Sequence, residues 1–246
     1  MRVLQDLVLA FRFLTRIPLP GKSHAPDELS RAAKFFPIVG FVVALGAVGL
    51  RRLLNGHLAS PVVAALVLSY LVLITGGFHE DGLADTADGF GGGWNKEKIL
   101  EIMRDSRIGS FGALAIGLSL LARFSLLSNL RFDRFPTYLI AAHVLCRWTT
   151  LPLSFLLRPA RVEGQGAGVT LKTSVLSLIL GTLIAFIICY PLMYLALWIP
   201  FTAALAVTLL TALYYRSQIG GVTGDCFGAT NQLAEIAIYL CGVWVP

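Results

Sequence analysis

The chain has 246 residues, of which 56% are hydrophobic and only 14% are charged, and its mean hydropathy is +0.75. Soluble globular proteins carry about 25% charged residues, so this composition excludes an ordinary soluble domain and predicts an all-α, polytopic integral membrane protein. The net charge of +6 would favour nucleic acid as the partner of a soluble protein. The sequence contains no nucleic-acid-binding motif, and basic loops that anchor helices in a lipid bilayer account for the charge.

Residues 1–34 are predicted to form a cytoplasmic or interfacial N-terminal segment. Apolar residues recur at helical spacing from Leu4 to Leu14, and Pro18 ends the pattern. This spacing is typical of an amphipathic helix that lies in the membrane interface. Charged residues interrupt the apolar stretch and no small-residue cleavage site follows it, so the segment lacks the pattern of a signal peptide.

Apolar stretches that are long enough, or nearly long enough, to cross a bilayer follow along the rest of the chain. They predict a single transmembrane domain over residues 1–246 with six or seven transmembrane helices. Seven is the preferred number, and the fifth and sixth helices are separated at Pro191. The predicted spans are residues 35–50, 61–79, 110–130, 137–157, 174–190, 192–214 and 231–245.

The distribution of basic residues predicts which side of the membrane each loop faces. In the seven-helix arrangement, 14 loop lysines and arginines lie on the N-terminal side and 4 lie on the opposite side. Because basic loops stay in the cytoplasm, the N-terminus is predicted to be cytoplasmic. The polar segments 80–109, 158–173 and 215–230 then face the cytoplasm together and are predicted to form the active site.

The second predicted span leads into an acidic, glycine-rich stretch, GGFHEDGLADTADGFGGG, at residues 76–93. In an α-helix, Asp81, Asp85 and Asp88 share a strip about 60° wide. Hard cations such as Mg²⁺ bind to a few carboxylates together with substrate phosphates, so this spacing favours a Mg²⁺ site over a solvated acidic helix end. Asp88 by preference, and otherwise Asp85, is the predicted catalytic base. The neighbouring residues predicted to contact substrate are His79 and Glu80.

The next segment, MRDSRIGSFG at residues 103–112, is predicted to bind phosphate. Arg104 and Arg107 lie on one face of a helix, and their guanidinium groups suit phosphate oxygens. The glycines that follow let backbone N–H groups approach an anion where the third span begins. Asp105 is a further predicted substrate contact. Anchoring at the membrane surface is the alternative role for the two arginines.

A second glycine-rich acidic segment, GGVTGDCFGATNQLAE, starts at Gly220. It is predicted to form the other wall of the same site, with Asp225 as a fourth Mg²⁺ ligand. Two arginines, Arg123 and Arg147, fall inside predicted spans, where an unpaired charge is unfavourable; a buried structural network and substrate binding both account for them. The remaining predicted substrate contacts are Thr223 and Asn231 in this segment, and Arg161 and Glu163 in the loop RPARVEGQGAG.

Four motifs, HEDGLADTADG, ILEIMRDSRIGSFG, ARVEGQGAG and GGVTGDCFGA, together resemble the cobalamin synthase family, adenosylcobinamide-GDP ribazoletransferase. The N-terminal segments FLTRIPLP and FFPIVG are similar to that family as well, so the resemblance covers nearly the whole chain. Asp81, Asp85 and Asp88 match the family pattern, whereas Glu80 occupies a position that is often apolar in it.

The resemblance implies a Mg²⁺-dependent transferase in the cytoplasmic (inner) membrane of a bacterium or archaeon. Such an enzyme joins adenosylcobinamide-GDP to α-ribazole or to α-ribazole 5′-phosphate. The products would be GMP and adenosylcobalamin or its 5′-phosphate, at the late nucleotide-loop step of vitamin B12 biosynthesis. A homo-oligomer and other cobalamin-assembly enzymes are the partners that the resemblance suggests.

Two other classes of protein fit part of the pattern. A CDP-alcohol phosphotransferase also carries spaced aspartates beside Asp-Gly, but an Ala-Arg pair follows soon after its first aspartates. In this chain Ala84 is followed by Asp85. A cation-coupled transporter fits the spans, but it does not require an arginine- and glycine-rich phosphate surface on one side of the membrane.

Overall fold

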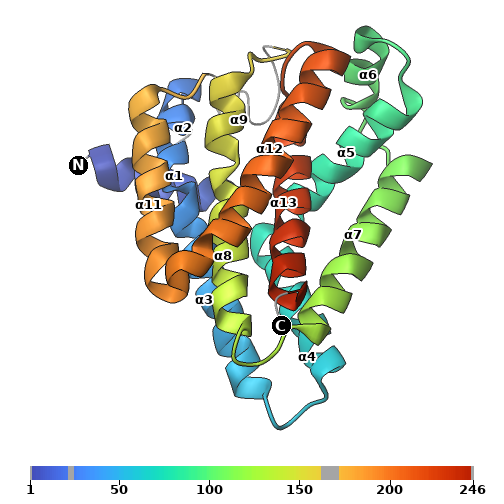
Figure 1. Ribbon diagram of the computed structural model, residues 1–246. Coiled ribbons are helices and arrows are strands. Elements are labelled where there is room, and N and C mark those ends of the chain that lie inside the picture. Colours follow the sequence, from blue (N-terminus) through green and yellow to red (C-terminus); the bar gives the residue numbers. More distant parts are fainter. Residues whose placement is uncertain (1, 22–24, 162–171, 245–246) are drawn as a thin grey trace.

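The computed structural model describes residues 2–21, 25–161 and 172–244. Within these ranges the chain folds into helices joined by turns and contains no β-strand, which confirms the all-α class (Figure 1). The helices are α1 (Arg2–Leu14), α2 (Pro26–Ala32), η1 (Ala33–Phe35), α3 (Phe36–Leu54), α4 (Ser60–Thr75), α5 (Phe78–Gly92), α6 (Lys96–Ile102), α7 (Ser110–Asn129), α8 (Phe135–Trp148), α9 (Thr150–Leu156), α11 (Val175–Met193), η2 (Tyr194–Leu197), α12 (Trp198–Ile219) and α13 (Gly224–Trp244).

Each predicted span corresponds to one helix or to two consecutive helices: α3, α4, α7, α8 with α9, α11, α12 and α13. Among the described residues, four helical segments are long and apolar enough to cross a membrane, and α4 with α5 would make a fifth only as a pair bent by 85°. One of the four, Val175–Ile219, has 45 residues and turns back at η2, so that α11 and α12 run in opposite directions (Figure 1). The fold is therefore that of a multi-pass helical membrane protein, while the number of spans stays a prediction.

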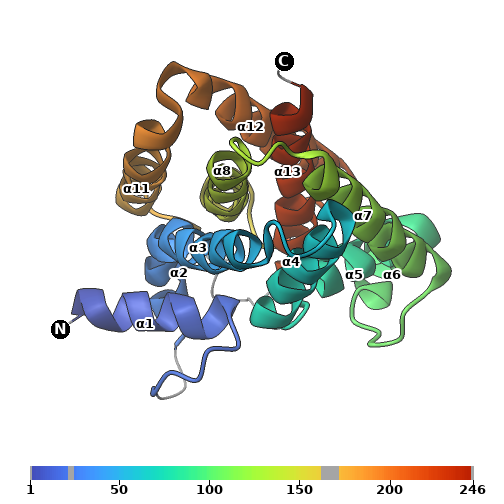
Figure 2. The same ribbon diagram turned by 90° about the horizontal axis from the view of Figure 1, so that it is seen from below.

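Helix α8 lies at the centre of the bundle. Every residue from Tyr138 to Trp148 is buried, and α3, α11, α12 and α13 surround the helix (Figure 2). The outer helices expose large apolar side chains instead, for example Leu118 on α7 and Ile187 on α11. This pattern, in which apolar residues face outward as well as inward, is expected of a bundle that is surrounded by lipid.

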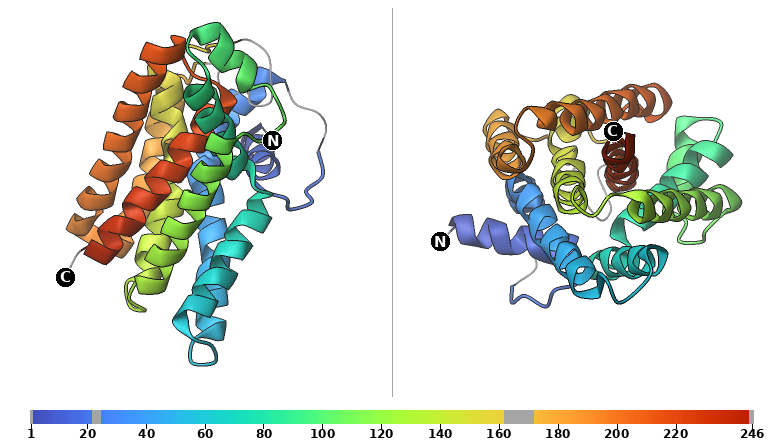
Figure 3. Two further views of the ribbon diagram at one scale, coloured as in Figure 1. Left: turned by 90° about the vertical axis from the view of Figure 1, so that its right-hand side faces the viewer. Right: turned by 60° about the horizontal axis from the view of Figure 1, so that its bottom comes forward.

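The polar connections collect at one end of the bundle. Helix α6, the end of α9 and the turn between α12 and α13 lie there, whereas the loop between α3 and α4 lies at the opposite end (Figures 1 and 3). The described parts of the three segments 80–109, 158–173 and 215–230 are thus near one another, as the sequence predicts. Helix α1 lies across the bundle rather than along it (Figure 2), an arrangement that suits the predicted interfacial helix.

Two glycines turn the chain sharply between α4 and α5. Gly76 and Gly77 have φ angles of +68° and +70°, in the left-handed region where residues with a Cβ are disfavoured. The N–H of Gly76 donates to the carbonyl of Leu73, which ends α4, and α5 leaves at an angle of 85°. Helix α4 is therefore the apolar part of the predicted span 61–79, and α5, which carries four acidic residues, is a separate helix that follows it.

Candidate functional site

The acidic helix α5 packs against α13 through glycines. A Cβ at Gly82 would lie 2.8 Å from the backbone oxygen of Asp225 and 3.2 Å from the Cα of Gly228. Small residues allow two helix backbones to approach this closely. The crossing places Asp225, which lies in the first turn of α13, beside the acidic strip of α5.

Four aspartates influence one another where α5 and α13 cross. Asp85 is half-buried, and burial together with the carboxylates of Asp225, Asp81 and Asp88 raises its pKa to about 7. Burial also raises the pKa of Asp225, while the positive charge of Arg161 opposes that shift. The four carboxylates that the sequence predicts to bind Mg²⁺ thus lie close enough for three of them to affect Asp85, although among the described residues no three of them place carboxylate oxygens within 4.8 Å of one another.

Two of the predicted substrate contacts hold Asp225 in place. Nη2 of Arg161 donates to Oδ2 of Asp225 at 2.8 Å, and Oγ1 of Thr223 donates to the same oxygen at 3.1 Å. Because Arg161 follows α9 in the chain, its ion pair connects the loop after α9 to the start of α13. Glu163, a third predicted contact in this region, lies outside the described residues.

The carboxylate of Asp88 binds the first turn of α7. The backbone N–H of Gly109 donates to Oδ2 of Asp88 at 2.7 Å, and that of Gly112 donates to Oδ1 at 2.8 Å. A Cβ at either glycine would overlap this carboxylate, so a larger residue at either position would displace Asp88 from the two N–H groups. The anion that these N–H groups meet is thus Asp88, where the sequence suggested a phosphate, and the helix dipole of α7 adds to the attraction.

The donor set at the crossing of α5 and α13 fits a hard cation. Asp81 is exposed and Asp85 is half-buried, so both carboxylates can be reached from outside, and Asp225 faces them from the second helix. Mg²⁺ keeps several water molecules and is usually held by one or two carboxylates with substrate phosphates. A crossing of two acidic helices therefore suits Mg²⁺ without the closed shell of protein ligands that a structural metal needs.

A second group of possible metal ligands lies deeper in the bundle. In the described part of the chain, only His143, Cys146 and Glu235 place three ligand atoms within 4.8 Å of one another. However, Nη1 of Arg147 lies 2.9 Å from Nδ1 of His143, and Nη1 of Arg123 lies 3.6 Å from Oε1 of Glu235. Two buried guanidinium groups repel a cation here and the cluster has only one carboxylate to offset them, so it suits a metal ion less well than the crossing of α5 and α13, where a single arginine, Arg161, lies beside several carboxylates.

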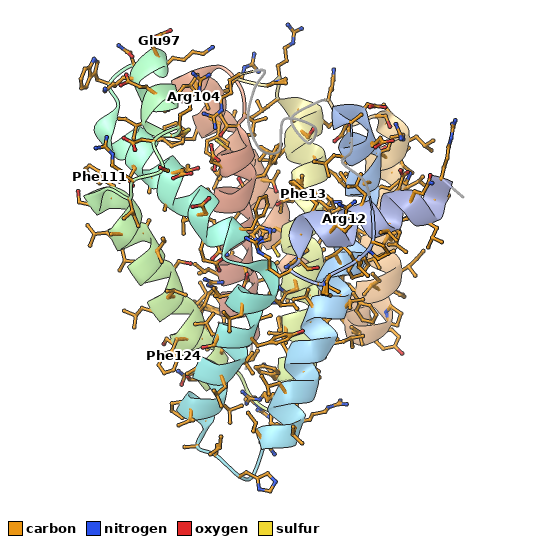
Figure 4. The ribbon with its side chains drawn as sticks, turned by 180° about the vertical axis from the view of Figure 1, so that it is seen from behind. Arg12, Phe13, Glu97, Arg104, Phe111 and Phe124 are labelled. Atoms are coloured by element: carbon orange, nitrogen blue, oxygen red, sulfur yellow. The ribbon has the colours of Figure 1, made fainter. Side chains whose placement is uncertain are left out.

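An open cleft adjoins the acidic helix. It has a volume of ≈ 580 Å³ and lies between the end of α5, α6 and the start of α7. Asp105 and Arg107 line it and bind each other, with Nη2 of Arg107 2.6 Å from Oδ2 of Asp105. The hydrogen bonds from Arg107 lower the pKa of Asp105 to about 2. Arg104 is exposed at the same end of the molecule (Figure 4) but does not line this cleft.

Three predicted substrate contacts are buried between helices instead. His79 lines a cavity of ≈ 20 Å³ between α1, α3, α5, α9 and α13, which is large enough for about one water molecule. Asn231 is 2% exposed. Glu80 is 8% exposed, and its Oε1 lies 2.8 Å from Nη2 of Arg123. The structure thus places these three residues in the packing of the bundle and away from the exposed carboxylate Asp81.

The sequence left open whether Arg123 and Arg147 belong to a structural network or bind substrate, and the structure favours the network. Arg123 lies between Glu80 and Glu235, and Arg147 hydrogen-bonds His143. Glu235 was not singled out from the sequence as the partner of Arg123. The available signal was an acidic residue inside a predicted span, since such a residue usually pairs with a basic residue of another span.

These features define a multi-pass helical membrane protein whose acidic and basic residues gather in a site at one end of the bundle. The chain belongs to the cobalamin-5-phosphate synthase family, whose model matches residues 6–243. A protein of *Azorhizobium caulinodans* is 42% identical over 99% of this chain and 97% of its own length. One of *Mesorhizobium japonicum* is 40% identical over 97% and 93%, and one of *Shewanella amazonensis* is 39% identical over 97% and 95%. All three relatives are named adenosylcobinamide-GDP ribazoletransferase. No solved structure matches the chain significantly.

Proposed function

We propose that the polar end of the bundle is the active site of an adenosylcobinamide-GDP ribazoletransferase. The substrates are adenosylcobinamide-GDP and α-ribazole or its 5′-phosphate, and the products are GMP and adenosylcobalamin or its 5′-phosphate. The observation that carries this proposal is the meeting of Asp81, Asp85 and Asp225 at the crossing of α5 and α13, with the ion-paired Arg161 beside them. Clustered carboxylates with arginines nearby suit a reaction at a diphosphate.

In the proposed reaction a ribazole hydroxyl attacks the phosphorus that carries cobinamide. A new P–O bond forms to ribazole, the P–O bond to the GMP portion breaks, and GMP leaves with the electron pair. Asp85 accepts the proton of the attacking hydroxyl, because a carboxyl group with a pKa of about 7 is an effective base near neutral pH. We prefer Asp85 to Asp88 for this role, since both oxygens of Asp88 already accept backbone hydrogen bonds.

The remaining residues bind and orient the substrates. Asp81 and Asp225 would hold Mg²⁺. When the ion is bound, it would neutralise negative charge on the diphosphate of the substrate. Arg107 lines the adjoining cleft, where its guanidinium group can bind phosphate oxygens of the nucleotide after exchanging its partner Asp105. We further propose that this end of the bundle faces the cytoplasm, in agreement with the distribution of basic residues along the chain.

Incubation of the purified protein with adenosylcobinamide-GDP, α-ribazole 5′-phosphate and Mg²⁺ tests the proposal. We expect one GMP and one corrinoid product for each turnover, and no product when a chelator removes Mg²⁺. A protein that binds the corrinoid but releases no GMP would favour the transporter alternative. Release of CMP from a CDP-alcohol, with no reaction of the corrinoid, would favour the CDP-alcohol phosphotransferase alternative.

A further inference from the structure

We infer that the four acidic residues of α5 have two different roles: Glu80 and Asp88 clamp α5 against α7, and Asp81 and Asp85 are left free to meet ligands. Glu80 and Asp88 are thus positioning residues. The ligand-facing role of the other two rests on the proposed function, whereas the clamp is a matter of packing. The sequence predicts that Asp81, Asp85 and Asp88 share one ligand-binding strip with Asp88 as the preferred base, whereas the structure binds Asp88 to α7.

Burial divides the four residues in the same way. Glu80 and Asp88 are each 8% exposed, whereas Asp81 is exposed and Asp85 is half-buried. Asp88 differs from Asp81 although the two lie within about 20° of each other around the helix. The reason is that the first turn of α7 covers the end of α5 that carries Asp88, as its two backbone hydrogen bonds show.

At the other end of the clamp, Glu80 joins α5 to two helices. Its Oε1 lies 2.8 Å from Nη2 of Arg123 on α7 and accepts a hydrogen bond of 3.2 Å from Nε2 of Gln232 on α13. Ser119 of α7 in turn donates to Oε1 of Gln232 at 3.0 Å. Because a buried carboxylate is stable only when it is paired, Glu80 fixes the start of α5 to α7 and α13.

The two contact points are far enough apart to fix the direction of α5 as well as its position. Glu80 and Asp88 are separated by about 12 Å along α5, at 1.5 Å per residue. Their partners on α7 are Arg123, which binds Glu80, and Gly112, which binds Asp88. These two partners are separated by about 16 Å along α7. A helix that is held at two such points can neither rotate about its axis nor slide along its neighbour without breaking at least one of them.

Apolar side chains hold only the two ends of helix α5, where Phe78 packs against Phe13 and Phe90 packs against Tyr214 and Tyr215. Between Phe78 and Phe90, a range that the structure describes in full, none of its buried residues is a large apolar one. They are His79, Glu80, Gly82, Ala84, Thr86, Asp88 and Gly89. Small residues permit a close approach but define rotation poorly, whereas buried polar pairs can specify register. The rotation of α5 decides whether Asp81 and Asp85 face Asp225.

Four matched substitutions test the inference, because each removes one negative charge from the same helix with little change in volume. In purified protein without Mg²⁺ or substrate, Asp81→Asn and Asp85→Asn should keep the wild-type Tm or raise it, since each removes a negative charge that is repelled by the neighbouring carboxylates. Glu80→Gln and Asp88→Asn should lower the Tm by about 4 °C or more, because each leaves buried donors without a charged acceptor.

Kinetics then separate positioning from ligand binding. In Glu80→Gln and Asp88→Asn, kcat should fall while the Mg²⁺ concentration for half-maximal activity stays within about twofold of the wild type. In Asp81→Asn, that Mg²⁺ concentration should rise by at least about tenfold. The inference is overturned if Asp88→Asn or Glu80→Gln keeps the wild-type Tm and raises the Mg²⁺ requirement as Asp81→Asn does.

A double-mutant cycle tests the ion pair independently of any reaction. Arg123→Gln should lower the Tm more than Glu80→Gln, because it leaves both Glu80 and Glu235 without their guanidinium partner. The double variant should lose less than the sum of the two single losses. Additive losses would refute the clamp at Glu80. Since these Tm values need no substrate, they hold even if the proposed transferase reaction fails, and that failure would appear only in the assay of GMP release.

Discussion

The close crossing of α5 and α13 predicts a specific loss of activity in Gly82→Ala. The added Cβ would lie 2.8 Å from the backbone oxygen of Asp225, whereas ordinary contacts begin at 3.4 Å. The two helices must therefore separate by the difference, about 0.6 Å, because backbone atoms cannot turn aside as a side chain can. That movement carries Asp225 away from Asp81 and Asp85.

The expected magnitudes for Gly82→Ala follow from this displacement. Overpacking costs about 1–3 kcal/mol, and the higher helix propensity of alanine returns about 1 kcal/mol, so the net loss of stability is about 0–2 kcal/mol. The effect on kcat should be larger, about 10- to 100-fold, because catalytic groups tolerate little misplacement. GMP release by the purified variant measures the activity, and thermal unfolding measures the stability.

Gly117→Ala is the matched control for this prediction. Gly117 also lies within a helix, but a Cβ there would meet no atom of the described chain within 4 Å. This variant should keep wild-type kinetics and gain up to about 1 kcal/mol in stability. If Gly82→Ala and Gly117→Ala have the same kcat, the close approach of α5 and α13 does not position the site and the reasoning is wrong.

Three further predictions concern the cleft, the pH profile and the topology. Arg107→Lys keeps the charge but loses the planar fork, so KM for adenosylcobinamide-GDP should rise about tenfold with the Tm unchanged; an unchanged KM would leave Arg107 as a membrane anchor. Burial and the neighbouring carboxylates raise the pKa of Asp85 to about 7, and Asp85 must be ionised to accept a proton, so kcat should fall on the acid side of a pH step that moves to lower pH as the Mg²⁺ concentration rises; the residual activity of Asp85→Asn should lack this step. Glu97→Cys, placed on exposed α6 beyond the capping residue Asn95, should react in a cysteine-free background with an impermeant reagent only from the cytoplasmic side; labelling from outside intact cells would reverse the predicted orientation.

Much of the fold follows from local pattern in the sequence. The apolar stretches predicted the helices because a chain in lipid must satisfy its backbone hydrogen bonds within each segment. The separation near Pro191 was also predictable, although α11 continues to Met193 and the turn falls at Tyr194–Leu197. Spacing on one helix likewise indicated that Asp81 and Asp85 share a face, since that depends only on the helical repeat.

The parts that could not be predicted depend on contacts between distant segments. Asp88 has the same helical phase as Asp81, and nothing in its spacing reveals that the first turn of α7 covers it. The partner of Glu80 is Arg123, 43 residues further along the chain, and several basic residues were equally plausible partners. The prediction that Arg104 and Arg107 share a helix face was wrong, because α6 ends at Ile102 and both residues lie in the loop after it; only Arg107 lines the cleft beside Asp88.

The burial of Glu235 has a consequence for how the protein enters the membrane during synthesis. Helix α13 is absent from the described helices that are apolar enough to cross a bilayer, and it carries Glu235 in its middle, 2% exposed. A lone carboxylate is unfavourable in lipid, and its partner Arg123 belongs to α7, which the ribosome completes more than 90 residues earlier. If α13 is a span, as the sequence predicts, we therefore expect it to insert only beside α7, so that Glu235 meets Arg123 as it leaves water.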